Sequence, residues 1–157
     1  KFGYKRPLMI APIFMGVGLF WLSRIKVHDS YLTGVLPGLV IIAIGMGTIF
    51  VAITIAATSG VPKDKAGLSS GLLNTSQQIG GALGLAILSG VSASKVASYL
   101  SHHAHQVNKM AFAQVNGSKY AFLTGVVFAI LALLLATFLV KEDRSKPVVI
   151  DPSMAAL

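Results

Sequence analysis

The sequence predicts an all-α membrane protein with four transmembrane helices. Of its 157 residues, 54% are hydrophobic and only 11% are charged, which is too little polar surface for a soluble domain of this length. The charged residues gather in a few short segments, and the uncharged tracts between them are about as long as a helix needs to cross a bilayer. The tracts that meet this requirement are 7–23, 36–57, 68–91 and 120–140.

The first tract, 7–23, is slightly short and contains Pro12. A membrane helix tolerates such a proline where neighbouring helices satisfy the carbonyl that it frees. Trp21 lies near the end of the tract, where an amphipathic ring prefers the membrane interface. The interior of the tract has almost no polar residues, and we expect it to face lipid.

The second tract, 36–57, contains polar residues that are poor evidence for a site. Thr48 and Thr54 can bond back to carbonyls of their own helix. Gly45 and Gly47 indicate either a flexible point or a close helix contact, and helix packing is the better explanation.

The third tract, 68–91, combines small residues with amides and is the most informative part of the chain. Asn74, Gln77 and Gln78 fall on one helical face, because three- and four-residue steps return to the same side. They either line a substrate path or a mobile helix interface, or they form hydrogen bonds that hold neighbouring helices together. Such interhelical hydrogen bonds contribute about 0.6 kcal/mol each, and both interpretations stay open. Small residues let another helix backbone come close, and we assign helix packing to Gly71, Gly80, Gly81 and Gly84.

The fourth tract, 120–140, has a lipid-facing composition and follows a long connection, 92–119, that we expect on the outer side. Apolar residues recur at helical spacing in that connection, which predicts an amphipathic helix on the membrane surface. Asn116 and Gly117 then predict a turn into the last tract. The tail, 141–157, is charged and proline-punctuated, and we expect it to be cytoplasmic and disordered.

The distribution of lysine and arginine predicts the orientation. With the N-terminal end in the cytoplasm, the inner side holds eight of these residues and the outer side five, which favours a cytoplasmic location for both ends of the chain. We therefore expect a multi-pass protein of the cell (inner) membrane, with residues 1–6 as the remnant of a cytoplasmic loop. The net charge of +8 follows from these flanking cations, and no basic stripe with interleaved aromatics predicts nucleic-acid binding.

Residues that could carry catalysis or hold a metal do not occur in the membrane tracts. The acids fall in predicted loops or in the tail: Asp29, Asp64, Glu142, Asp143 and Asp151. The chain has no cysteine and no recognisable nucleophile–base pair or nucleotide loop, so we expect neither an enzyme nor a cofactor. His102, His103 and His105 lie together without a nearby carboxylate, which is more typical of a solvated surface cluster, and we expect no metal site.

Two segments carry a family resemblance. The third tract resembles the penultimate span of the fourteen-helix drug:proton antiporters of the major facilitator superfamily, through Gly67-Leu68-Ser69-Ser70-Gly71, Asn74, Gln78, Gly80-Gly81 and Gly84. The start of the chain resembles the end of that superfamily's Gly-x-Arg/Lys-Arg cytoplasmic loop motif, through Gly3, Lys5 and Arg6. The resemblance covers nearly the whole chain, although the loop motif is truncated.

The resemblance implies that the four helices are the last four of fourteen, in the C-terminal helical bundle of a major facilitator fold. The first and fourth helices would be peripheral, the second would line the central cavity, and the third would lie between the two halves. Lys5 and Arg6 would sit where such loops latch the halves, although a simple topology anchor explains them equally well.

The resemblance also implies a function and its partners. It implies efflux of small hydrophobic or cationic compounds in exchange for protons, by alternating access within the lipid bilayer. A proton-coupled carrier needs an ionisable group inside the membrane, and the four tracts contain none. We therefore expect a C-terminal fragment of a secondary active transporter, whose N-terminal part is the missing partner.

One alternative is a self-contained four-span protein, acting as a helix-docking module or a small oligomeric exporter. Small multidrug exporters depend on an acid within a helix, and its absence here argues against that version.

Overall fold

A computed structural model describes residues 5–58, 61–103 and 109–138. The described chain is all-helical, as the sequence predicted. Its α-helices are α1 (Lys5–Leu22), α2 (Leu36–Thr58), α3 (Ala66–His102) and α4 (Lys109–Phe138). A π-helical turn (Tyr31–Val35) leads into α2, and a 3-10 turn (Lys63–Lys65) leads into α3.

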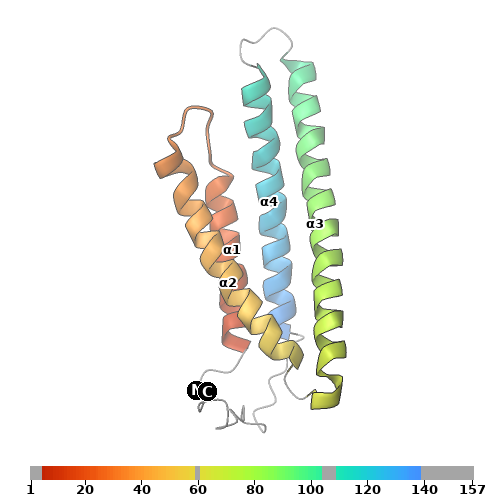
Figure 1. Ribbon diagram of the computed structural model, residues 1–157. Helices are drawn as coiled ribbons and strands as arrows, with labels where there is room; N and C mark the ends of the chain where they lie inside the picture. The colour runs from red at the N-terminus through yellow and green to blue at the C-terminus, as the bar shows by residue number, and fades with distance from the viewer. Residues whose placement is uncertain (1–4, 59–60, 104–108, 139–157) are drawn as a thin grey trace.

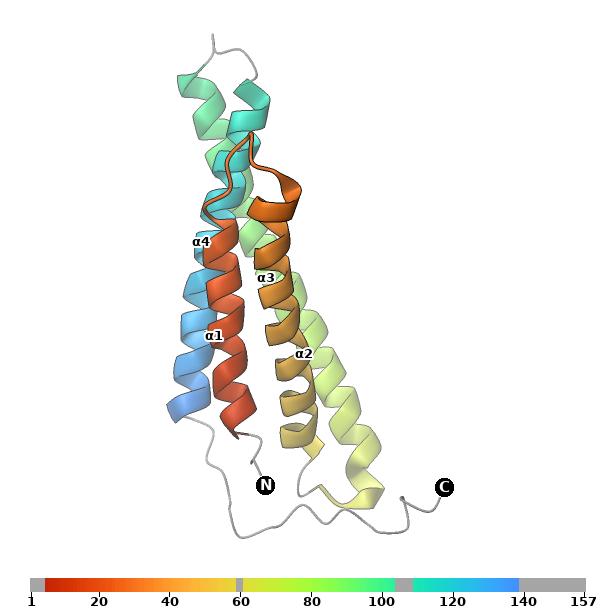
Figure 2. The ribbon, with the colours of Figure 1, turned by 90° about the vertical axis from the view of Figure 1, so that its left-hand side faces the viewer.

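The four helices run up and down as an elongated bundle (Figure 1). Seen from two directions, α1 lies between α2 and α4, and α3 packs against the far side of α4 (Figure 2). Contacts between α2 and α3 are much fewer. We call the end that carries the 23–30 loop and His102 the upper end, and the end that carries Lys5 and Phe138 the lower end. Successive helices run in opposite directions between these two ends (Figure 1), as expected of successive membrane spans.

Glycine lets α1 and α2 approach to backbone contact. A Cβ added to Gly18 would lie 2.8 Å from the carbonyl oxygen of Gly38, and one added to Gly38 would lie 3.2 Å from that of Gly18. Farther down, a Cβ on Gly45 would lie 3.0 Å from the carbonyl oxygen of Ala11. Small residues at helix crossings are the usual device for bringing membrane helices together.

The upper parts of α3 and α4 correct two expectations. Most of 92–119, expected as a long connection with a surface helix, belongs to the two helices, which continue past the 23–30 loop as a hairpin (Figure 1). Asn116 and Gly117 lie inside α4 and make no turn. Gly117 is buried, and a Cβ there would lie 2.6 Å from Cγ2 of Val96. The apolar stripe of α3 therefore packs on α4, where the missing side chain of glycine is needed for contact.

The interior is small and the outer surface is apolar. The buried residues of the described chain are mainly glycines and alanines, and they include Gly18, Gly117, Ala11 and Ala113. Large side chains point outward: Leu85 is 70% exposed and Phe138 is 76% exposed. Among the described residues, α2 with its preceding turn, α3 and α4 are long and apolar enough to cross a membrane, and α1 is a shorter apolar helix. Such an apolar exterior suits lipid, so the bundle is that of a multi-pass membrane protein.

Candidate functional site

The candidate substrate path predicted from the sequence lies on the lower half of α3. Gln77 is half-buried, whereas Asn74 and Gln78 are exposed. The three amides share one side of the helix by their spacing. Of the three, only Gln77 is partly covered by the rest of the described chain. None of the residues of α3 is fully buried.

The glycines beside these amides have no neighbour among the described residues. A Cβ added to Gly71, Gly80, Gly81 or Gly84 would find nothing within 4 Å in that part of the chain. This contrasts with the contacts at Gly18 and Gly117, where a Cβ would overlap another helix. The small-residue face of α3 is thus open within the described part of the chain, and the helix packing expected of these glycines stays a prediction.

Two threonines of α2 donate hydrogen bonds within their own helix. The hydroxyl of Thr48 donates to the carbonyl oxygen of Ile44 at 2.8 Å, and that of Thr54 donates to Phe50 at 2.8 Å, which confirms the predicted back-bonding. Of the α2 glycines assigned to packing, Gly45 lies against α1, and a Cβ on Gly47 would meet nothing within 4 Å among the described residues.

The loop motif at the start of the chain is only partly described. Gly3 lies outside the described residues. Lys5 is the first residue of α1, but its side chain also lies outside the description. Arg6 follows it in the helix and is exposed at the lower end.

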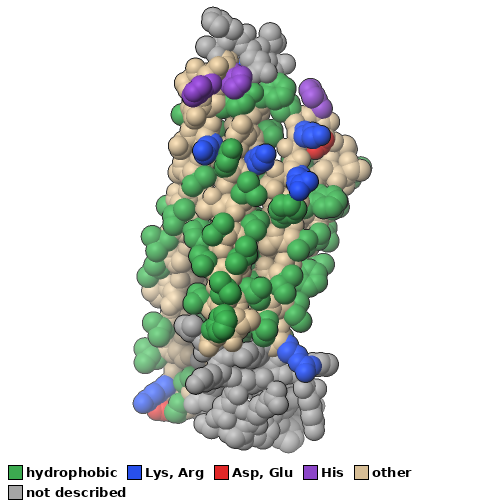
Figure 3. Space-filling model, turned by 180° about the vertical axis from the view of Figure 1, so that it is seen from behind, with side chains coloured by type: hydrophobic (Ala, Val, Ile, Leu, Met, Phe, Trp, Pro, Cys, Tyr) green, Lys and Arg blue, Asp and Glu red, His purple; other side chains and the backbone are tan. Residues whose placement is uncertain are grey.

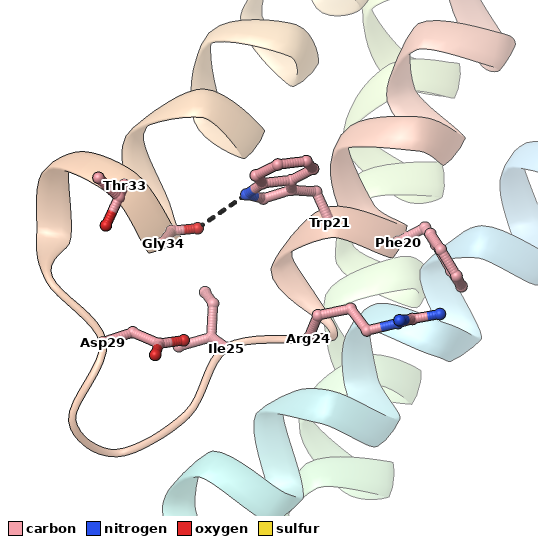
Figure 4. Close-up of a pocket in the computed structure, with 7 residues that line it drawn as sticks. All are labelled: Phe20, Trp21, Arg24, Ile25, Asp29, Thr33 and Gly34. Carbon is pink, nitrogen blue, oxygen red and sulfur yellow. Dashed lines mark hydrogen bonds between the residues drawn. The ribbon is translucent and has the colours of Figure 1, made fainter.

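A recess at the upper end was not predicted (Figure 4). It has a volume of about 470 Å³ and lies where the last turn of α1 faces the π-helical turn. The indole Nε1–H of Trp21 donates to the carbonyl oxygen of Gly34 at 3.0 Å and ties the two elements together. Oδ2 of Asp29 accepts the backbone N–H of Lys26 at 2.8 Å, which closes the loop. Asp29, Arg24 and Thr33 also line the recess (Figure 4).

The upper end also gathers cations (Figure 3). The guanidinium of Arg24 lies 4.8 Å from the ring centre of Phe20, and the ammonium of Lys95 lies 4.6 Å from that of Tyr120. These are distances at which a cation is attracted to an aromatic face. Lysine and arginine thus stand at the level of the aromatic rings, as at a membrane interface.

The predicted histidine cluster is described in part. His102 Nδ1 lies 2.7 Å from the carbonyl oxygen of Ser98. The ring of His103 stacks on Tyr99 at 4.2 Å between ring centres. His105 lies outside the described residues. Within the described chain, no three His, Cys, Asp or Glu residues come together as a metal site would require.

The upper-end recess could not be predicted from the sequence, because the residues that line it follow no regular spacing along the chain. Trp21 indicated the interface, but nothing in the sequence shows that its N–H reaches Gly34 across the loop. The π-helical turn that presents Gly34 has no reliable sequence signal either.

Comparison with known proteins gives a consistent set of relatives. The family model described as the Major Facilitator Superfamily matches residues 1–85. The chain is similar to the puromycin resistance protein pur8 of Streptomyces alboniger, with 35% identity over 78% of this chain and 24% of that protein. It is also similar to the cephamycin export protein CmcT of Amycolatopsis lactamdurans, with 41% identity over 57% of this chain and 18% of that protein.

A further relative is the multidrug resistance protein Stp of Mycobacterium tuberculosis, with 29% identity over 66% of this chain and 19% of that protein. No solved structure matches the chain significantly. The chain therefore spans about a quarter or less of the length of the curated relatives that it matches.

Proposed function

This chain belongs to the major facilitator superfamily, and we propose that it is the C-terminal part of a transporter that exports drugs or antibiotics from the cell. In this proposal it contributes the last four of fourteen helices, and the remaining helices complete the substrate cavity. Its role is transport across the membrane rather than catalysis.

The relatives support an export function. Their names describe resistance to puromycin, export of cephamycin and resistance to multiple drugs. These compounds differ chemically, so the proposed substrate class is broad: small, hydrophobic or cationic molecules.

The open face of α3 is the observation that carries the proposal. Asn74 and Gln78 are exposed on a helix that is long and apolar enough to cross a membrane. In hydrocarbon, amide groups without partners cost free energy, and polar residues within spans usually face the protein interior. The glycines beside them have the shape of a close contact, but no described residue fills it. Helices of the other half of the transporter would cover this face.

Within the complete transporter, Asn74, Gln77 and Gln78 would lie at the interface of the two halves or along the substrate path. Alternating access moves one half against the other around a midplane site. A helix at that interface needs small residues for sliding contact and polar groups for the substrate, and α3 has both.

Proton coupling would come from outside this chain. Asp29 and Asp64 are the described acids, and each lies outside the α-helices. An acid within an earlier helix would carry the proton. With both ends of the chain in the cytoplasm, the lower end faces inward, and Gly3, Lys5 and Arg6 would form the cytoplasmic loop that latches the halves.

The coding sequence upstream of Lys1 tests this proposal. We expect an open frame that encodes about ten more apolar spans, with an acid inside an early one. A start codon and ribosome-binding site directly before Lys1 would overturn it and favour a self-contained four-span docking module.

A further inference from the structure

A second cavity at the upper end is lined by three cations. It has a volume of about 310 Å³ and lies between the end of α1, the loop that follows and α4. Arg24, Lys26 and Lys119 all contribute to its wall. The sequence separates Lys119 widely from the other two, and the packing of α4 on α1 brings them together.

No carboxylate offsets these charges within the cavity, as far as the described lining residues show. Asp29 is the described acid at the upper end, and its carboxylate accepts the backbone N–H of Lys26 and lines the neighbouring recess instead. Three cationic residues that line one cavity without an acid favour an anion, and a phosphate group has enough oxygens to accept a hydrogen bond from each.

The cavity lies at the depth of lipid headgroups. The stretch 120–138 of α4, directly below Lys119, carries no charge and rises about 29 Å, close to the thickness of the hydrocarbon core. On α1 the uncharged stretch ends at Arg24. Trp21 and Tyr120 lie beside these cations in the chain, where interfacial rings are expected.

Apart from Ser23, whose hydroxyl donates to the carbonyl oxygen of Phe20, the rest of the cavity wall is apolar. Phe20, Ile25 and Leu123 line it together with the cations. Hydrophobic side chains also cover the face of the molecule below the band of cations (Figure 3). A ligand with a charged head and a hydrocarbon tail fits such a surface better than a free ion does, because its tail can follow the apolar face.

We propose that this cavity binds the phosphate of an anionic phospholipid from the upper, outer leaflet. Arg24, Lys26 and Lys119 hold the phosphate, and Phe20, Ile25 and Leu123 contact the part of the lipid that enters the hydrocarbon. This proposal depends on the location of the bundle in a membrane and not on transport. Its test is therefore independent of the proposed function.

Native mass spectrometry of the full protein containing this chain tests the site, with phosphatidylglycerol and phosphatidylcholine of equal chain length as probes. We expect phosphatidylglycerol to bind more tightly. Arg24→Gln or Lys119→Gln should each weaken it about fivefold, the effect of one cation near an anionic lipid surface. Lys119→Arg keeps the charge and should keep the binding, which separates a lost contact from a misfolded protein.

Lys95→Gln is the matched control, because Lys95 is a cation 4.6 Å from the ring centre of Tyr120, the residue that follows Lys119, but does not line the cavity. It should change binding by less than about twofold, given that exposed charges act mainly at short range. Equal binding of the two lipids, or equal losses in Lys95→Gln and Lys119→Gln, would overturn the proposal. Displacement of phosphatidylglycerol by an equal concentration of inorganic phosphate would show a site for soluble phosphate and would also overturn it.

Discussion

A Cβ added to Gly117 would lie 2.7 Å from the carbonyl oxygen of Ser92, so α4 meets the backbone of α3 at a point that accepts no side chain. This contact lies in the upper part of the α3–α4 hairpin. It explains why a glycine that resembles a turn residue in the sequence lies inside a helix.

Gly117→Ala should destabilise the α3–α4 hairpin. The new methyl group meets backbone that cannot rotate away, and overpacking of this kind costs about 1–3 kcal/mol. The measurement is the midpoint of thermal unfolding of the full protein in detergent, followed by circular dichroism. Gly125→Ala is the control on the same helix, since the atom nearest to its Cβ would be the flexible end of Leu19, at 3.0 Å. An equal effect of the two variants would contradict the close contact at Ser92.

The crossing of α1 and α2 gives a second prediction. Gly18→Ala should separate the two helices, because the added Cβ would lie 2.8 Å from the carbonyl oxygen of Gly38. Gly16→Ala on the same helix should be tolerated, since its Cβ would make an ordinary contact of 3.4 Å with Ala129. Alanine is also favoured over glycine in helices by about 1 kcal/mol. Unfolding in detergent distinguishes the variants, and loss of stability in Gly16→Ala alone would refute the packing described.

The orientation can be measured with single cysteines, because the chain has none of its own. Ser30 lies in the loop at the upper end and Asp64 in the turn at the lower end, and both are exposed. In intact cells that express the full protein, a membrane-impermeant maleimide should label Ser30→Cys and not Asp64→Cys, because positive charge favours a cytoplasmic lower end. The reverse pattern would show that the outer face is the lower one.

The amides of α3 separate a substrate path from simple helix docking. Gln77→Ala should reduce export by the full protein about fivefold while the amount of folded protein stays unchanged, since one hydrogen bond contributes roughly 1 kcal/mol. The measurement is accumulation of a small cationic dye in cells. Gly84→Leu should instead lower the amount of folded protein, because bulk would block the expected helix contact. Normal export by Gln77→Ala and Gln78→Ala would assign these amides to docking alone.

The sequence predicts the helices well and their contacts poorly. Uncharged length indicates that four α-helices are present, as the described residues show, because a bilayer requires about 20 apolar residues of any order. The ends are harder: α3 continues to His102 because it packs on α4, and that stabilisation comes from Gly117, far along the chain. The amides of α3 are singled out by the sequence because polar residues are rare in spans, and their role stays a prediction. The cationic cavity was missed because Arg24 and Lys119 meet only through packing.

Transport by reconstituted protein tests the central claim most directly. The full protein and the 157-residue chain would be placed in separate liposomes, and movement of a cationic dye would be followed after a pH gradient is imposed. We expect the full protein to move the dye and the chain alone to leave it in place, because the chain has no acid within its described α-helices to carry a proton. Dye movement by the chain alone would contradict its assignment as one part of a larger exporter.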